Sequence, residues 1–150
     1  MNVIITIGAP GSGKSTWAKN KEGYVYLSTD AARAELGTGE NDQSVSSQAF
    51  ELIRNRLSEN LQRGNDVIID ATNMYVKARN QFIDICQKYD ANVHAIVFKL
   101  DKNELMKRNT ERGLKGGRCV PENVIDSMLN RYAEPTFEEG FSSIEFYKQQ

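Results

Sequence analysis

The chain is poor in the residues that build disulfide frameworks and metal clusters. Among its 150 residues it has two cysteines, Cys86 and Cys119, and a single histidine. Two cysteines far apart in the sequence, with no histidine cluster beside them, predict free thiols rather than a disulfide or a zinc site. We therefore expect the protein to work in a reducing compartment.

The sequence also lacks long apolar runs and a strong charge of either sign. No apolar stretch approaches the roughly 18 residues of a membrane-spanning helix, and the first residues lack the features of a signal peptide. The formal net charge is −1, whereas an extended non-specific nucleic-acid tract requires a basic face. These absences predict a cytoplasmic protein without a membrane partner, and they leave room for a local basic patch.

The stretch Gly8-Ala-Pro-Gly-Ser-Gly-Lys-Ser15 fits the P-loop pattern of Gly, four free positions, Gly-Lys and Ser or Thr. An apolar, β-branched run over residues 2–7 precedes it, and a segment without helix breakers over 15–20 follows it. This order of strand, loop and helix lets backbone N–H groups surround an anion. A chance match within a chain of this length has a probability of about 1% or less. The motif predicts a nucleoside-triphosphate site.

Each residue type in this loop has a physical role. The glycines let the backbone come close to a phosphate. Lys14 would place its charge on the β and γ phosphates of ATP, and the Ser15 hydroxyl would be a ligand of Mg²⁺. Thr16 follows as a supporting residue. The expected nucleotide-binding residues of the loop are Gly8, Gly11, Ser12, Gly13, Lys14, Ser15 and Thr16.

Strand patterns alternate with helical patterns along the chain. We expect strands over residues 2–7, 24–28, 67–69, 93–100 and 141–147, and helices over 15–20, 31–36, 43–63, 75–89, 102–112 and 121–132. Such alternation predicts a single α/β domain over 1–150, with a parallel sheet and helices on both faces. Residues 114–120 contain two glycines and two basic residues, which favours a mobile loop and a lid over about 102–120.

Ligands of open α/β sheets bind outside the carboxyl ends of the strands. Asp30 follows the second expected strand, where its carboxylate could take the proton of a hydroxyl that attacks the γ-phosphate. Aspartate also suits the N-cap of the following helix. Arg33 lies one helical turn later and can face the same side as Asp30. It could grip an acceptor phosphate, or it could be an ordinary surface arginine.

The third expected strand ends in a second polar group. Asp70 occupies the place where P-loop proteins have a carboxylate that helps to hold Mg²⁺, directly or through water. A capping or turn role would also suit this residue. Thr72 and Asn73 follow it, and they either contact an acceptor or begin the next helix.

The expected lid carries a local excess of positive charge. Residues 99–118 contain seven basic and three acidic side chains. Arg108 and Arg112 are four residues apart, on one face of a helix, before a glycine-containing loop. Paired arginines in this position favour a lid that closes over the triphosphate and supplies charge in the transition state. A charged, solvated helix is the alternative interpretation.

With these motifs the chain resembles the kinase domain of the 5′-hydroxyl polynucleotide kinases, above all the bacteriophage T4-type, within the small P-loop kinases. The resemblance runs from residue 2 to about 132 and rests on Gly8–Ser15, Asp30-Ala-Ala-Arg33, Asp70-Ala-Thr-Asn73 and Arg108-Asn-Thr-Glu-Arg112-Gly113. It implies transfer of the ATP γ-phosphate, with Mg²⁺, to the 5′-OH end of single-stranded DNA or RNA, a reaction of nucleic acid repair. It also implies the cytoplasm of a bacterium or a phage-infected cell, and a homo-oligomer like the phage enzyme.

The resemblance also implies roles for individual residues. Asp30 would be the general base and Arg33 would hold the acceptor's 3′-phosphate. Lys14 and the lid arginine Arg112 would contact the ATP phosphates during transfer. Asp70 matches a carboxylate of the family with a less defined role.

Two other functions use the same motifs. The tail from Arg131, with Glu134-Pro135 and Glu138–Phe141, is more similar to a broader group of small P-loop kinases. One alternative is therefore a kinase of a sugar, an antibiotic or a nucleotide sugar. The other is an ATP-binding switch or ATPase without an acceptor. Asp30 argues against the second, because an ATPase needs a group that positions water.

Overall fold

The computed structural model describes residues 1–9, 12–37, 43–99, 101–117 and 119–147. Five strands form one sheet in the order β2-β3-β1-β4-β5, and all four pairings are parallel. The strands are β1 (Asn2–Ile7), β2 (Val25–Ser28), β3 (Val67–Asp70), β4 (Asn92–Phe98) and β5 (Ser143–Tyr147). The sheet confirms the predicted α/β fold class.

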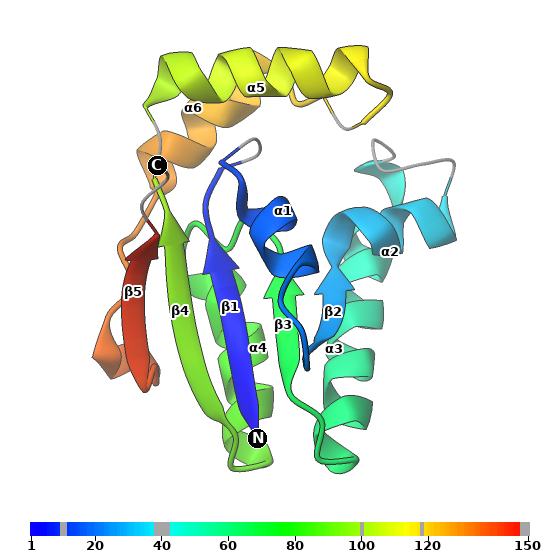
Figure 1. Cartoon of the computed structure of the whole chain (residues 1–150), viewed down its shortest axis with the longest axis vertical. Coiled ribbons are helices and arrows are strands. Elements are labelled where there is room, and N and C mark those ends of the chain that lie inside the picture. The colour runs from blue at the N-terminus through cyan, green and yellow to red at the C-terminus, as the bar shows by residue number, and fades with distance from the viewer. Residues whose placement is uncertain (10–11, 38–42, 100, 118, 148–150) are drawn as a thin grey trace.

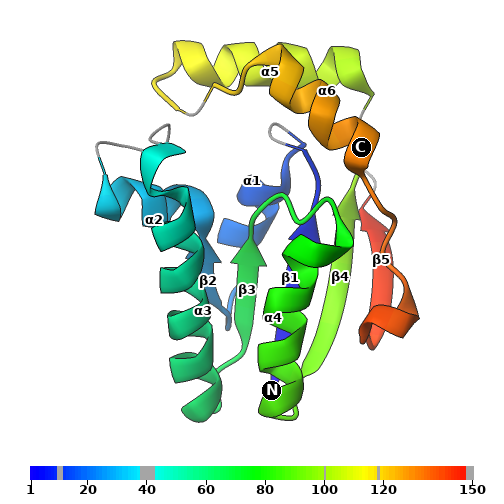
Figure 2. The same cartoon turned by 180° about the vertical axis from the view of Figure 1, so that it is seen from behind.

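Helices cover both faces of the sheet and its carboxyl edge. Helix α1 (Lys14–Lys19) lies on one face, and α3 (Ser46–Gln62) and α4 (Val76–Lys88) lie on the other (Figures 1 and 2). Helix α2 (Thr29–Leu36) follows β2, and α5 (Lys102–Leu114) and α6 (Glu122–Arg131) pass over the carboxyl ends of the strands (Figure 1). Two short 3₁₀ helices are η1 (Gln43–Val45) and η2 (Phe137–Glu139). None of the helices within the described ranges has both the length and the apolar character to cross a membrane.

The central strands are apolar at nearly every position because both of their faces are covered. In β1, Val3, Ile5 and Ile7 belong to the core beneath α3 and α4. Ile4 points to the opposite face and packs in a smaller cluster with Ala18 of α1. This alternation follows from the two-residue period of a strand.

Helix α5, which belongs to the expected lid, contacts two loops at the carboxyl edge of the sheet through a third apolar cluster. Leu105 of α5 packs with Ala9, which follows β1 and Gly8, and with Met74 in the loop between β3 and α4. All three side chains are at least 95% buried. The amino-terminal part of the lid is therefore fixed to the loops that precede α1 and α4.

Most helix boundaries differ from the sequence expectation by one to three residues, and two of the differences have a clear physical cause. Helix α2 begins at Thr29, because the Ser28 hydroxyl caps it and accepts a hydrogen bond from the N–H of Ala31 at 3.2 Å. The capping role for Asp30 was therefore wrong. Helix α5 does not end at Gly113, and it continues to Leu114. A Cβ at position 113 would lie 2.8 Å from the Cβ of Cys119, so this glycine serves close packing rather than helix termination.

Candidate active site

A pocket of about 510 Å³ lies at the carboxyl edge of the sheet, lined by residues of α1, β2, α2 and α5. Side chains of both charges line it, and the basic ones are in excess. The basic residues are Lys14, Lys19, Arg108, Arg112 and Lys115, and the acidic residues are Asp30 and Glu111. This excess suits a polyanionic ligand such as a triphosphate.

Two glycines of the P-loop are required for different steric reasons. Gly13 has a φ of +94° immediately before α1, a conformation that favours glycine. At Gly8 the need is space, since a Cβ there would lie 2.7 Å from Oγ of Ser12 and 2.8 Å from the carbonyl oxygen of Phe98. Gly11 lies outside the described residues. The loop thus folds as the motif requires where it is described.

Lys14 and Tyr26, which line the pocket, form a polar group with Asp70. The Nζ of Lys14 lies 4.0 Å from Oδ1 of Asp70, and both side chains are more than 90% buried. The Tyr26 hydroxyl donates a hydrogen bond to Oδ2 of the same carboxylate. Burial and the neighbouring Asp70 carboxylate raise the pKa of Tyr26, so the phenol stays protonated and remains a donor.

The oxygen donors here fit a magnesium ion that arrives with a nucleotide. Ser15 lines the pocket, and Oδ1 of Asp70 lies 4.0 Å from Nζ of Lys14. Mg²⁺ prefers oxygen ligands and is commonly held by one or two protein groups together with phosphate oxygens and water. Ser15 and Asp70 can supply these protein ligands of Mg²⁺.

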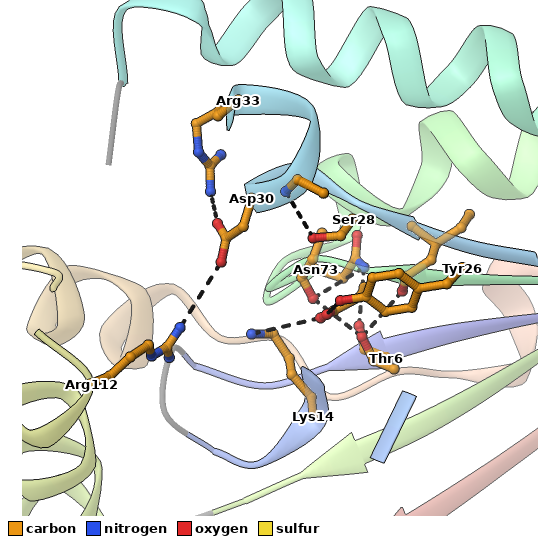
Figure 3. A network of polar contacts seen from close by, with 12 residues as sticks. Thr6, Lys14, Tyr26, Ser28, Asp30, Arg33, Asn73 and Arg112 are labelled. Carbon is orange, nitrogen blue, oxygen red and sulfur yellow. Dashed lines mark hydrogen bonds and ion pairs between the residues drawn. The ribbon is translucent and has the colours of Figure 1, made fainter. Parts of the chain in front are cut away.

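Asp30 lies between two arginines, and Figure 3 shows its carboxylate facing both. The Arg33 guanidinium donates to Oδ1 of Asp30, and Nη1 of Arg112 lies 3.9 Å from Oδ2. Asp30 lines the pocket, whereas Arg33 is only 3% exposed. The surface interpretation of Arg33 was therefore wrong, and the one-turn spacing does bring Asp30 and Arg33 together.

Both expected lid arginines, Arg108 and Arg112, line the pocket from α5. Arg108 donates to Glu104 at 2.9 Å, one turn earlier. Gly117 leaves space for Arg112, because a Cβ there would lie 2.7 Å from Cγ of that arginine. Both arginines thus line the same pocket, as their spacing on one helix face predicted.

The segment after α5 is held by a residue that the sequence analysis did not select. Asn109 is buried, and its Nδ2 donates to the carbonyl oxygen of Val120 at 2.6 Å. The N–H of Val120 donates back to Oδ1 of Asn109 at 2.8 Å. These bonds connect Val120, the last residue of the loop expected over 114–120, to α5.

Thr72 and Asn73 do not lie together at the pocket. Asn73 is 2% exposed with a φ of +48°, and its Nδ2 donates to the carbonyl oxygen of Thr6 at 3.0 Å. Its side chain holds the loop to β1, so it is not placed to contact an acceptor. Thr72 is half-buried and lines a separate hollow. Neither begins a helix, because α4 starts at Val76.

Several pocket residues were missed in the sequence analysis: Lys19, Tyr26, Glu111 and Lys115. Tyr26 stands two residues before Ser28 on β2, so the strand period puts both on one side. The strand alternation could therefore have identified Tyr26 as a pocket residue from the sequence. Lys115 was visible only within the basic excess of the lid.

A groove of about 450 Å³ continues from this pocket along α1. It shares Gly13, Thr16 and Arg108 with the pocket. Its other wall includes Trp17 and Tyr147, whose ring centroids are 6.4 Å apart in an edge-to-face arrangement. The groove therefore offers aromatic surface next to the phosphate-binding loop.

The chain is similar to known P-loop proteins over most of its length. A family model described as an AAA domain matches residues 3–135. Its curated relatives include the bifunctional polynucleotide phosphatase/kinase of Schizosaccharomyces pombe, 26% identical over 147 residues, which cover 95% of this chain and 32% of that protein. The L-seryl-tRNA(Sec) kinase of Methanococcus maripaludis is 30% identical over 145 residues, which cover 89% of this chain and 53% of that protein.

Among solved structures, a chain of the Pnkp1/Rnl/Hen1 RNA repair complex superposes with a TM-score of 0.74 at 27% identity. The match covers 87% of this chain and 43% of that chain. The present chain thus spans about a third to a half of the length of these relatives.

Proposed function

The chain belongs to the AAA domain family of P-loop proteins and has the P-loop kinase fold; from this premise we propose that it phosphorylates the 5′-hydroxyl end of single-stranded DNA or RNA with ATP. The observation that carries the proposal is the position of Asp30. Its carboxylate lines the same basic pocket as Lys14. A carboxylate near the phosphates suits a hydroxyl acceptor, which must lose a proton as it attacks.

The proposed reaction is a direct transfer. Lys14 and the P-loop backbone hold the β and γ phosphates, and the acceptor oxygen forms its bond to the γ-phosphorus as the bond to the ADP oxygen breaks. Asp30 takes the acceptor's proton. Ser15 and Asp70 would hold Mg²⁺, which neutralises charge on the phosphate oxygens when bound. Arg112 adds positive charge from the lid.

Arg33 has a double role in this proposal. Its guanidinium already orients the Asp30 carboxylate, and a guanidinium has five N–H donors in a fixed fork. In this proposal the same guanidinium also binds the acceptor's 3′-phosphate while Asp30 is held in place. The groove beside Trp17 and Tyr147 would receive the adenine ring on its aromatic wall.

A second candidate is a kinase with a smaller hydroxyl acceptor, such as a sugar, an antibiotic or a nucleotide sugar. The 30% identity to a relative named L-seryl-tRNA(Sec) kinase supports this candidate, because a similar domain is there named for a hydroxyl acceptor other than a 5′ end. The two candidate functions share ATP as the phosphoryl donor and differ only in the molecule that carries the acceptor hydroxyl.

The deciding experiment follows labelled γ-phosphate from ATP·Mg²⁺ to a 5′-OH oligonucleotide, beside a 5′-phosphorylated strand of the same sequence. Label on the 5′-OH strand alone, lost in Lys14→Ala, is the expected result. Absence of label despite nucleotide binding would overturn the polynucleotide acceptor, and a panel of sugars and nucleosides would then test the second candidate.

A further inference from the structure

A second pocket, of about 300 Å³, lies between α6 and the loop that joins β3 to α4. Thr72 and Tyr75 line it from the loop. From α6 it is lined by Val124, Ser127, Met128 and Arg131, at a spacing that places them on one helix face. The reaction proposed above assigns no role to this pocket.

Its most distinctive feature is a stacked pair, which we call the Tyr75–Arg131 platform. The guanidinium carbon of Arg131 lies 4.4 Å from the centroid of the Tyr75 ring, well inside the roughly 6 Å limit of a cation–π contact. Tyr75 is half-buried and Arg131 is exposed, so the platform is accessible from solvent. Unpaired bases stack on aromatic rings and on arginine planes.

The pocket is connected to the phosphate site through the chain. Thr72 follows Asp70 by two residues, and its carbonyl oxygen accepts a hydrogen bond from the N–H of Gly8 at 3.0 Å. The first pocket is bounded by α1, whereas the second lies beside the start of α4. Those two helices cover opposite faces of the sheet (Figures 1 and 2). In the proposed reaction, ATP in the first pocket and an acceptor strand in the second can therefore approach the P-loop from different faces of the sheet.

We propose that the Tyr75–Arg131 platform binds an unpaired base of the acceptor strand, downstream of the 5′-terminal nucleotide. This inference rests on the proposed function. The positive charge of Arg131 attracts the adjoining phosphate, and the Thr72 and Ser127 hydroxyls can bond to the base or sugar edge. Because stacking uses the face that all bases share, the subsite has little base preference.

The test compares two acceptors that share the 5′-OH but differ in length: a single nucleoside 3′-phosphate and a single-stranded 5′-OH hexamer. Tyr75→Leu keeps an apolar side chain against the lid cluster and removes the ring, and Arg131→Gln removes the charge. Each variant should raise the KM for the hexamer about tenfold. The KM for ATP, the KM for the mononucleotide and kcat should stay as in wild type.

Tyr75→Phe keeps the stacking ring and should retain the wild-type KM for the hexamer. Arg63→Gln, at an exposed arginine just after α3, is the matched charge control. An unchanged KM for the hexamer in Tyr75→Leu and Arg131→Gln would overturn the subsite and leave the proposed function intact. An equal rise for both acceptors would also overturn it, because it would indicate a structural role. Failure of wild type to phosphorylate either acceptor would overturn the proposed function, and this inference with it.

Discussion

Nη1 of Arg112 lies 3.9 Å from Oδ2 of Asp30, so a lid residue and a residue of α2 face each other across the pocket. The other oxygen of the same carboxylate accepts a hydrogen bond from Arg33. Arg33 and Arg112 thus lie against the two oxygens of the carboxylate that we propose as the general base.

The first prediction concerns Asp30→Asn. The amide has the same shape and can still accept a hydrogen bond from Arg33, but it cannot take a proton from the acceptor. We expect kcat to fall by about 10²- to 10⁴-fold, with the affinity for ATP almost unchanged. Steady-state transfer of labelled phosphate and nucleotide titration measure the two quantities. Glu35→Gln, an exposed carboxylate on the same helix, should behave as wild type. Undiminished turnover in Asp30→Asn would remove the general-base role.

The second prediction concerns the lid. Arg112→Ala should lower kcat by about 10³-fold, because the charge that balances the transferring phosphoryl group is lost. Gly117→Ala should lower it by a smaller factor, since the new Cβ would lie 2.7 Å from Cγ of Arg112 and displace the side chain. Lys107→Ala, an exposed cation on α5, is the control. Equal rates in Arg112→Ala and Lys107→Ala would contradict a catalytic lid arginine.

Features that depend on local spacing were predictable from the sequence. The strand before the P-loop, the contact of Asp30 with Arg33 one turn away, and the arginines on one face of α5 all follow from a period of two or 3.6 residues. The hydrogen bond of Tyr26 to Asp70 joins β2 to β3, 44 residues apart. A periodicity argument identifies strands without fixing which of them are neighbours, so this pair could not be foreseen.

Asn73 illustrates a second limit of sequence reasoning. Its position after a strand is typical of a site residue, but its side chain holds the loop to Thr6. The decisive quantity is a φ of +48°, which asparagine tolerates better than most residues do. An asparagine required by the backbone and one required by a ligand look the same in a sequence.

The third prediction concerns Tyr26, which we assign to positioning Asp70. Tyr26→Phe removes one hydrogen bond to the carboxylate and keeps the ring. We expect the Mg²⁺ concentration for half-maximal activity to rise several-fold, with kcat at saturating Mg²⁺ close to wild type. A magnesium titration at fixed ATP measures this effect. A changed unfolding midpoint with an unchanged magnesium requirement would indicate a purely structural role.

The fourth prediction concerns stability and Arg79, which is fully buried. Its guanidinium contacts Glu139 at 2.8 Å and also donates to the carbonyl oxygens of Asn73 and Ala133. Arg79→Met leaves the Glu139 carboxylate and two carbonyl groups without this partner. We expect the free energy of unfolding to fall by about 3–5 kcal/mol.

Urea denaturation followed by circular dichroism measures the change. The matched control is Arg56→Met, which breaks an exposed pair with Glu35 and should cost less than about 1 kcal/mol. The double variant Arg79→Met with Glu139→Gln should be more stable than Arg79→Met alone, because it no longer buries an unpaired charge. Equal losses for the buried and exposed pairs would contradict the assignment.

The apolar contact of Leu105 with Ala9 and Met74 makes the two ends of the lid unequal. Detaching the amino-terminal end of α5 would expose three buried side chains to water, which is unfavourable. The end that carries Arg112 has no share in that cluster. Separating α5 from the two loops near Leu105 therefore costs apolar burial to which Arg112 does not contribute. We therefore expect backbone amides near Leu105 to exchange with solvent more slowly than those near Arg112, which hydrogen exchange can measure.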